Sequence, residues 1–153
     1  MSRWLGIDHG TRRIGLAVAN ASDGIACPVT VIPAQPAATV LQRIAEVVRQ
    51  YRAEGIVVGW PINMDGSEGP QGRLARAMAA DLAAATGLDV RLWDERLSSF
   101  AADEALAGTM TSSKRKARHD AVAAAAILRD FLASDGPARA LRPQDVPDKP
   151  PAT

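Results

Sequence analysis

The chain has 153 residues, 47% of them hydrophobic and 23% charged, a composition typical of one globular domain with its own core. Eighteen basic and seventeen acidic residues leave a net charge of +1, which excludes a protein that coats nucleic acid with its whole surface. One cysteine and two histidines exclude a disulfide framework, a cysteine-based zinc site and a histidine-rich metal site. No apolar segment is long enough for a signal peptide or a membrane span, so we expect a cytoplasmic protein with no membrane partner.

The first part of the chain predicts three short strands, at residues 3–8, 14–19 and 25–32. The connections between them are too short for crossovers, so the three strands form an antiparallel meander. Pro28 lies within the third strand and has no backbone N–H to donate, which places that strand at an edge of the sheet.

The middle of the chain alternates helices and strands. Apolar side chains from Val40 to Tyr51 recur at helical spacing, and we expect Gly55 to end that helix. The continuous apolar run at residues 56–59 is typical of a parallel strand covered on both faces. A loop at residues 61–70 leads to a second helix, and residues 90–93 predict another strand.

The C-terminal part predicts two helices and a tail. Ser99 caps a short helix with Asp103 and Glu104 in its opening turns, and the last helix runs from about residue 117 to residue 133. Residues 134–153 hold half of the ten prolines and few apolar side chains. We therefore expect a folded domain of residues 1–133 and a disordered tail of residues 134–153.

These elements predict an α/β fold, a mixed five-stranded sheet with helices on both faces. The strand order 3-2-1-4-5, with the first three strands antiparallel, places the proline-bearing strand at an edge. It also makes strands 1, 4 and 5 parallel, so that their C-terminal ends meet at one rim. Open α/β sheets place their functional sites at that rim.

Carboxylates gather at this predicted rim. Asp8 ends strand 1, while Asp94 and Glu95 end strand 5. For Asp8 the alternative is an Asx-turn that closes the hairpin with Gly10. For Asp94 and Glu95 the alternative is a strand end exposed to solvent.

A further carboxylate lies on the last predicted helix. Asp120 shares one helical face with Ala124, Ile127 and Phe131, an apolar stripe that we expect to face the sheet. A buried carboxylate needs a partner, although the alternative is a charge that only favours the helix N-terminus. Three carboxylates brought together stay ionised only if a cation neutralises them. Oxygen ligands select Mg²⁺ or Mn²⁺, and two such ions suit phosphoryl chemistry by activating a water and stabilising the leaving oxygen.

Four segments resemble the motifs of the YqgF family, also called RuvX or Holliday-junction-resolvase-like proteins, and together they span nearly the whole predicted domain. The segments are GIDHGTRRIGLAV at 6–18, VVGWPINMDGSEGP at 57–70, DERLSS at 94–99 and KARHDAVAA at 116–124. The resemblance implies an RNase H-like fold in a cytoplasmic bacterial protein. It implies a metal-dependent nuclease that matures the 5′ end of pre-16S rRNA in ribosome biogenesis. The matching catalytic and metal-binding acids are Asp8, Glu95 and Asp120.

Other functions stay open at this stage. The name of the family implies an alternative, a Holliday-junction resolvase in DNA recombination and repair, which would need two sites and hence a homodimer. A non-catalytic nucleic-acid-binding protein is a further alternative. The segment GIDHGT also resembles the first phosphate loop of the actin, hexokinase and chaperone ATPases. Those proteins need two such domains around the nucleotide, and this chain has the length of one.

Nucleic-acid contacts are predicted from basic residues close to the acids. Arg12 and Arg13 lie in the first turn, and Ser67 lies in a loop whose backbone N–H groups could hold a phosphate before the second helix. A basic cluster at the start of the last helix comprises Lys114, Arg115, Lys116 and Arg118. These cations suit phosphate contacts, and the alternative is a solvated face. The resemblance favours RNA over DNA as the partner.

Overall fold

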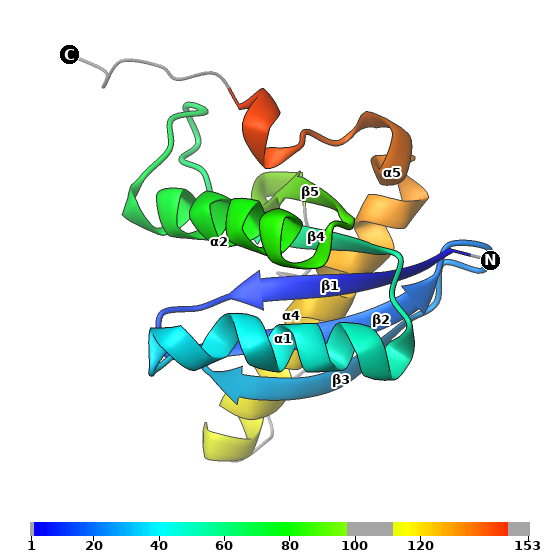
Figure 1. Ribbon diagram of the computed structural model, residues 1–153. Coiled ribbons are helices and arrows are strands. Elements are labelled where there is room, and N and C mark those ends of the chain that lie inside the picture. The colour runs from blue at the N-terminus through cyan, green and yellow to red at the C-terminus, as the bar shows by residue number, and fades with distance from the viewer. Residues whose placement is uncertain (1, 98–111, 147–153) are drawn as a thin grey trace.

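The computed structural model describes the backbone of residues 2–97 and 112–146 and the side chains of residues 2–97 and 121–146. Five strands form one mixed sheet in the order β3-β2-β1-β4-β5 (Figure 1). The strands are β1 (Arg3–His9), β2 (Arg13–Asn20), β3 (Ala26–Pro33), β4 (Gly55–Trp60) and β5 (Asp89–Asp94). β1, β2 and β3 are antiparallel, whereas β1, β4 and β5 are parallel. The predicted order and directions are confirmed.

Helices cover both faces of this sheet. α1 (Ala37–Tyr51) and α2 (Pro70–Thr86) lie on one face, and α4 (Ser112–Ala133) crosses β1, β2 and β3 on the other (Figure 1). α4 starts earlier than the predicted residue 117. The short helix expected after Ser99 lies outside the described residues. None of the helices in the described parts is long and apolar enough to span a membrane.

The sheet separates two apolar cores. The core beneath α1 and α2 includes Leu5, Ile7, Leu16, Ile44, Ile56 and Leu82. The core beneath α4 includes Trp4, Val57, Trp93, Ala124, Ile127, Leu128 and Phe131. Because successive side chains of a strand point to opposite faces, a residue's place in its strand decides which of the two cores it faces.

Small residues let α4 approach the sheet closely. A side chain built on Gly6 of β1 would place its Cβ 2.8 Å from Leu128 Cβ and 2.9 Å from the carbonyl oxygen of Ala124. Both atoms belong to the rigid part of the helix, so Gly6 is needed for this packing. The face of β1 that carries Gly6 is therefore the face that α4 covers.

Gly55 does not end α1, contrary to the sequence prediction. The helix ends at Tyr51, and Arg52 takes the left-handed conformation with φ 55°. Gly55 is instead the first residue of β4, where a Cβ would lie 2.7 Å from the ring of Trp4. A close contact in the core, rather than a helix cap, requires this glycine.

The prediction of a disordered tail is wrong for residues 134–146, which pack along the β5 edge of the sheet. They contain α5 (Gly136–Arg139) and a single 3-10 turn, η2 (Pro143–Asp145). The Leu92 N–H donates to the Leu141 carbonyl over 2.7 Å, so this segment satisfies part of the strand edge.

Side chains reinforce this packing. Arg91 donates to the carbonyl of Ala140 over 2.6 Å, and Val146 packs against the core beneath α1 and α2. The segment is poor in apolar residues and needs no core of its own, because it uses the hydrogen-bonding edge and the core of the preceding domain. The remainder of the predicted tail, residues 147–153, lies outside the described residues.

Candidate active site

Asp8 lies near the C-terminal end of β1, on the face that α4 covers. Gly6 and Asp8 are two positions apart, so both belong to the same face of the strand. The side chain is half-buried. Gln71 of α2 fixes the backbone next to it, because the Gln71 amide donates to the carbonyl oxygen of His9 over 2.7 Å.

Glu95 follows β5 directly and opens the 3-10 turn η1 (Glu95–Leu97). Trp93, two residues earlier, packs edge-on against Phe131 of α4 with ring centroids 6.0 Å apart. Glu95 reaches the same side of the sheet as Trp93 and extends across β4. A Cβ on Gly59 of β4 would lie 2.6 Å from Glu95 Oε1.

The carboxyl groups of Asp8 and Glu95 meet above β4. Burial raises the pKa of Glu95 to about 8, helped by the negative charge of Asp8, by a side-chain hydrogen bond to Asp8 and by the charge of Asp94. At neutral pH the metal-free protein therefore holds a proton between two carboxyl groups. A hard divalent cation fits this donor set, because carboxylate oxygens are its preferred ligands and its charge would offset theirs.

Asp94 has a different role from its neighbour. Its carboxylate accepts hydrogen bonds from Arg96, with Nη2 2.7 Å from Oδ2 and Nε 3.0 Å from the same oxygen. The strand alternation points Asp94 away from the α4 face to which Trp93 belongs. Of the two acids that end β5, the structure brings Glu95 to Asp8.

The third predicted acid, Asp120, is a residue of α4. The structure describes its backbone but not its side chain. The stripe that it continues is buried as predicted, because Ala124, Ile127 and Phe131 are each at most 2% exposed. Within residues 2–97 and 121–146, no three acidic, histidine or cysteine side chains lie close enough to hold one metal ion. A third ligand from Asp120 therefore stays a prediction.

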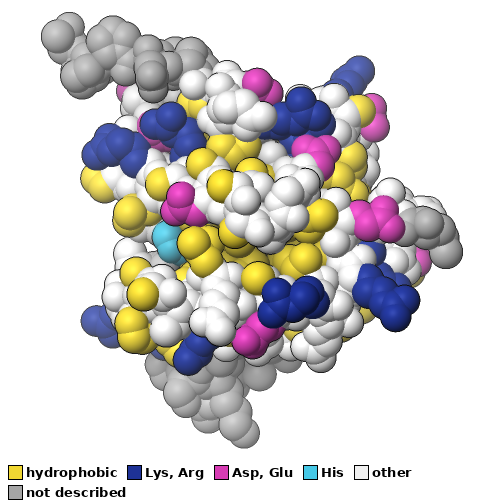
Figure 2. Space-filling model, in the orientation of Figure 1, with side chains coloured by type: hydrophobic (Ala, Val, Ile, Leu, Met, Phe, Trp, Pro, Cys, Tyr) yellow, Lys and Arg dark blue, Asp and Glu magenta, His cyan; other side chains and the backbone are white. Residues whose placement is uncertain are grey.

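The predicted nucleic-acid contacts fall in three places. Arg12 is exposed and Arg13 half-buried where the chain turns from β1 into β2, shortly after Asp8 and at the same rim. The basic cluster of residues 114, 115, 116 and 118 lies in the first turns of α4, with side chains outside the described residues. Figure 2 shows the face of α1 and α2, where the described basic and acidic side chains are interspersed.

Ser67 organises its own loop. Its N–H donates to Asp65 Oδ1 over 2.9 Å, and its hydroxyl donates to the same oxygen over 2.5 Å. The hydroxyl also accepts from the Asn63 amide over 2.9 Å. A phosphate at the Ser67 N–H would have to displace Asp65, so the structure gives no support to that predicted contact.

Comparisons with known proteins identify the family of this chain. The family model for RuvX, described as Holliday junction resolvase, matches residues 2–134. The chain belongs to the RuvX family. A relative from Anaeromyxobacter sp. (strain K) is 48% identical over 131 residues, which are 85% of this chain and 96% of the relative. One from Paracoccus denitrificans (strain Pd 1222) is 44% identical over 128 residues, 83% of this chain and 81% of the relative. Both carry the name "Putative pre-16S rRNA nuclease".

A solved structure of Thermus thermophilus RuvC, in complex with Holliday junction substrate, shares the fold of this RuvX chain. Its TM-score is 0.59 at 19% sequence identity, over 92% of this chain and 100% of that one. This likeness confirms the RNase H-like architecture. The RuvX match ends at residue 134, so most of the segment that packs along the β5 edge lies beyond it.

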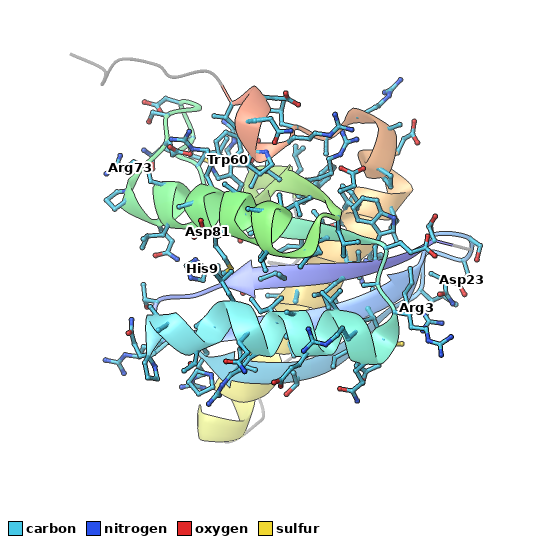
Figure 3. The ribbon with its side chains drawn as sticks, in the orientation of Figure 1. Arg3, His9, Asp23, Trp60, Arg73 and Asp81 are labelled. Carbon is cyan, nitrogen blue, oxygen red and sulfur yellow. The ribbon has the colours of Figure 1, made fainter. Side chains whose placement is uncertain are left out.

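Sequence reasoning missed the side chains that brace the RuvX site. Arg96 donates to the carbonyls of Met64 and Asn63, over 3.1 and 3.4 Å, and so joins the end of β5 to the loop after β4. Glu68, at the other end of that loop, accepts from the Trp60 indole over 2.8 Å and from Arg76 over 2.8 Å. Figure 3 shows Trp60 beside α2, with Arg73 near the start of that helix. Among the contacts of these side chains, the sequence carried a signal only for the pair of Asp94 and Arg96, which are two residues apart.

His9 is also part of the rim but faces away from the acids. It follows Asp8 in β1 and therefore points to the side of α1 and α2, as Figure 3 shows. Burial lowers its pKa, so the imidazole is neutral at pH 7. We assign it no part in the carboxylate pair.

Proposed function

We propose that this chain is a metal-dependent nuclease that hydrolyses phosphodiester bonds at the 5′ end of pre-16S rRNA. The meeting of Asp8 and Glu95 at the C-terminal rim of three parallel strands is the observation that carries this proposal. The names of the 48% and 44% identical relatives support the substrate, and the family supports the nuclease activity.

Asp8, Glu95 and Asp120 would hold two Mg²⁺ or Mn²⁺ ions. When bound, such ions supply a water nucleophile of lowered pKa and stabilise the leaving oxygen. Asp8 and Glu95 bind through oxygens that already lie together, so little rearrangement is needed. Glu95 must lose its proton for the ions to bind, which makes metal affinity rise with pH.

Basic side chains would hold the RNA backbone next to these acids. Arg12 and Arg13 lie at the rim of β1, and Lys114, Arg115, Lys116 and Arg118 lie on the first turns of α4. Phosphate contacts of this kind position the strand and carry no base information. Ribosomal RNA as a substrate places the protein in the cytoplasm. We also propose that the chain forms a homodimer, which only the alternative function described below requires.

The alternative is a resolvase acting on a four-way DNA junction. The description of the family and the likeness to the RuvC complex favour it. Because a resolvase cuts two symmetric strands, it requires two copies of the site on one junction. A protein that stays a monomer on the junction would argue against this alternative.

A cleavage assay distinguishes the candidates. Labelled pre-16S rRNA fragment, unrelated single-stranded RNA and a four-way DNA junction are incubated with the protein in Mn²⁺, Mg²⁺ or EDTA. We expect cleavage of the ribosomal precursor with metal, none with EDTA, and none by the Asp8→Asn or Glu95→Gln variant. Asp81→Asn, which changes an exposed acid on α2, is the matched control and should cleave normally. Junction cleavage alone would support the resolvase, and RNA binding without any cleavage would support a non-catalytic protein.

A further inference from the structure

We propose that Gly59 is a positioning residue, whose missing side chain leaves the space in which the carboxylates of Asp8 and Glu95 meet. The inference rests on the proposed nuclease function, since it concerns the same site. It adds a residue that bears no functional group and touches neither substrate nor metal.

The sheet topology makes this space necessary. Asp8 lies on β1 and Glu95 follows β5, and β4 runs between the two strands. Neighbouring strands are about 4.8 Å apart, so β1 and β5 are separated by roughly 10 Å. The two carboxyl groups can meet only above β4. Gly59 is the β4 residue at that level, one position beyond the pair Ile7–Val58 and directly opposite Trp93.

The contacts around Gly59 show what a side chain would displace. A Cβ on Gly59 would lie 2.6 Å from Glu95 Oε1 and 2.6 Å from Ile127 Cδ1. Both atoms are the far ends of flexible side chains, so alanine can be accommodated if the Glu95 carboxylate and the Ile127 methyl group move. The fold would survive, and Glu95 would leave its place beside Asp8.

The other glycines on this face serve packing instead. A Cβ on Gly6 would meet the backbone of α4, and a Cβ on Gly55 would meet the Trp4 ring at 2.7 Å. Only the Cβ of Gly59 would meet a carboxylate among the glycines that the structure describes on this face of the sheet. The requirement for glycine at this position comes from the site as well as from the helix contact.

Two substitutions separate the space that the Glu95 carboxylate needs from the space that Ile127 of α4 needs. Ile127→Val deletes only the Cδ1 methyl group, so Gly59→Ala/Ile127→Val removes the clash with α4 and keeps the clash with Glu95. Gly55→Ala, on the same strand and face but against Trp4, is the matched control for the general effect of a β4 substitution. Mn²⁺ affinity is measured by calorimetry, melting temperature by circular dichroism and cleavage with labelled RNA.

We expect Gly59→Ala to fold and to bind Mn²⁺ roughly 10- to 100-fold more weakly, as for the loss of other supports of metal ligands. The double variant should bind as weakly, and Gly55→Ala should bind as the wild type does at a lower melting temperature. Wild-type affinity in Gly59→Ala, or its recovery in the double variant, would show that the glycine serves helix packing alone. If the wild type binds no Mn²⁺, the nuclease proposal fails. A crystal structure of Gly59→Ala then still decides this inference, since an undisplaced Glu95 would overturn it.

Discussion

Glu95 keeps a proton that an exposed glutamate loses near pH 4.5, because its carboxyl group is buried beside Asp8. Ionising Glu95 costs additional free energy only in the folded state, where the carboxyl group is buried beside Asp8. A site built in this way is unfavourable without its cation, and the binding of the cation relieves the repulsion between the two acids. The burial of Glu95 and its repulsion with Asp8 therefore both destabilise the metal-free site and favour the binding of a cation.

The stability of the metal-free protein should decrease as the pH rises. Between pH 4.5 and about 8 the folded state keeps the Glu95 proton and the unfolded state has lost it, so the free energy of unfolding falls with pH. The stability that the bound Glu95 proton contributes to the folded state is complete below pH 4.5 and is lost as the pH rises through about 8. Melting temperatures across this range in EDTA measure it. Glu95→Gln and Asp8→Asn should have flatter profiles, and a wild-type profile as flat as theirs would contradict the proton between the acids.

The elements around the site are joined by hydrogen bonds that cross between loops. Arg96 binds Asp94 with two nitrogens and also donates to carbonyls in the loop after β4. It fixes the backbone immediately after Glu95 and shapes the adjoining loop. Lysine has the same charge but cannot make both sets of contacts.

Arg96→Lys should therefore reduce activity more than stability. The ion pair with Asp94 is partly exposed and screened by water, so we expect only a small change in the free energy of unfolding. A small displacement of Glu95 should lower the cleavage rate by about tenfold or more. Arg73→Lys is the control, because Arg73 makes one long hydrogen bond of 3.3 Å to the same loop. Equal cleavage rates for the two variants would exclude a positioning role for Arg96.

The start of α4 carries the basic cluster of residues 114, 115, 116 and 118. Replacing all four with Gln should weaken RNA binding similarly for every sequence. It should also reduce the slope of log affinity against log salt by roughly 0.7 for each phosphate that the variant no longer neutralises. The slope is measured by titrating one RNA at several salt concentrations. An unchanged slope would mean that the cluster is only a solvated surface.

At the scale of the whole molecule, the segment of residues 134–146 closes the β5 edge of the sheet, the strand that ends at the site. A truncation after Ala133 should lower the free energy of unfolding by about 2–4 kcal/mol, since it removes edge hydrogen bonds and the burial of Pro143 and Val146. A truncation after Val146 keeps every described contact and is the matched control. Thermal or urea unfolding measures both, and equal stabilities would show that the packing of this segment contributes little.

The rim of the sheet was predictable from the sequence because short connections fix an antiparallel meander and crossovers fix parallel strands. That topology alone brings Asp8 and the acids after β5 to one rim. The residues alone did not decide between Asp94 and Glu95. Both faces of β5 are covered, so its sequence shows no regular alternation of polar and apolar residues that would tell which acid faces α4. The contacts of Arg96 with Asn63 and Met64, and the packing of residues 134–146 along β5, could not be predicted, because they join segments that lie far apart in the sequence.

The central claim is that Asp8, Glu95 and Asp120 form one metal site. A crystal structure of the protein soaked in Mn²⁺, with anomalous diffraction data, tests it most directly. We expect anomalous peaks between the carboxylates of Asp8 and Glu95, with Asp120 of α4 as a further ligand. Manganese bound elsewhere, or an Asp120 side chain turned to solvent away from Asp8, would contradict the account.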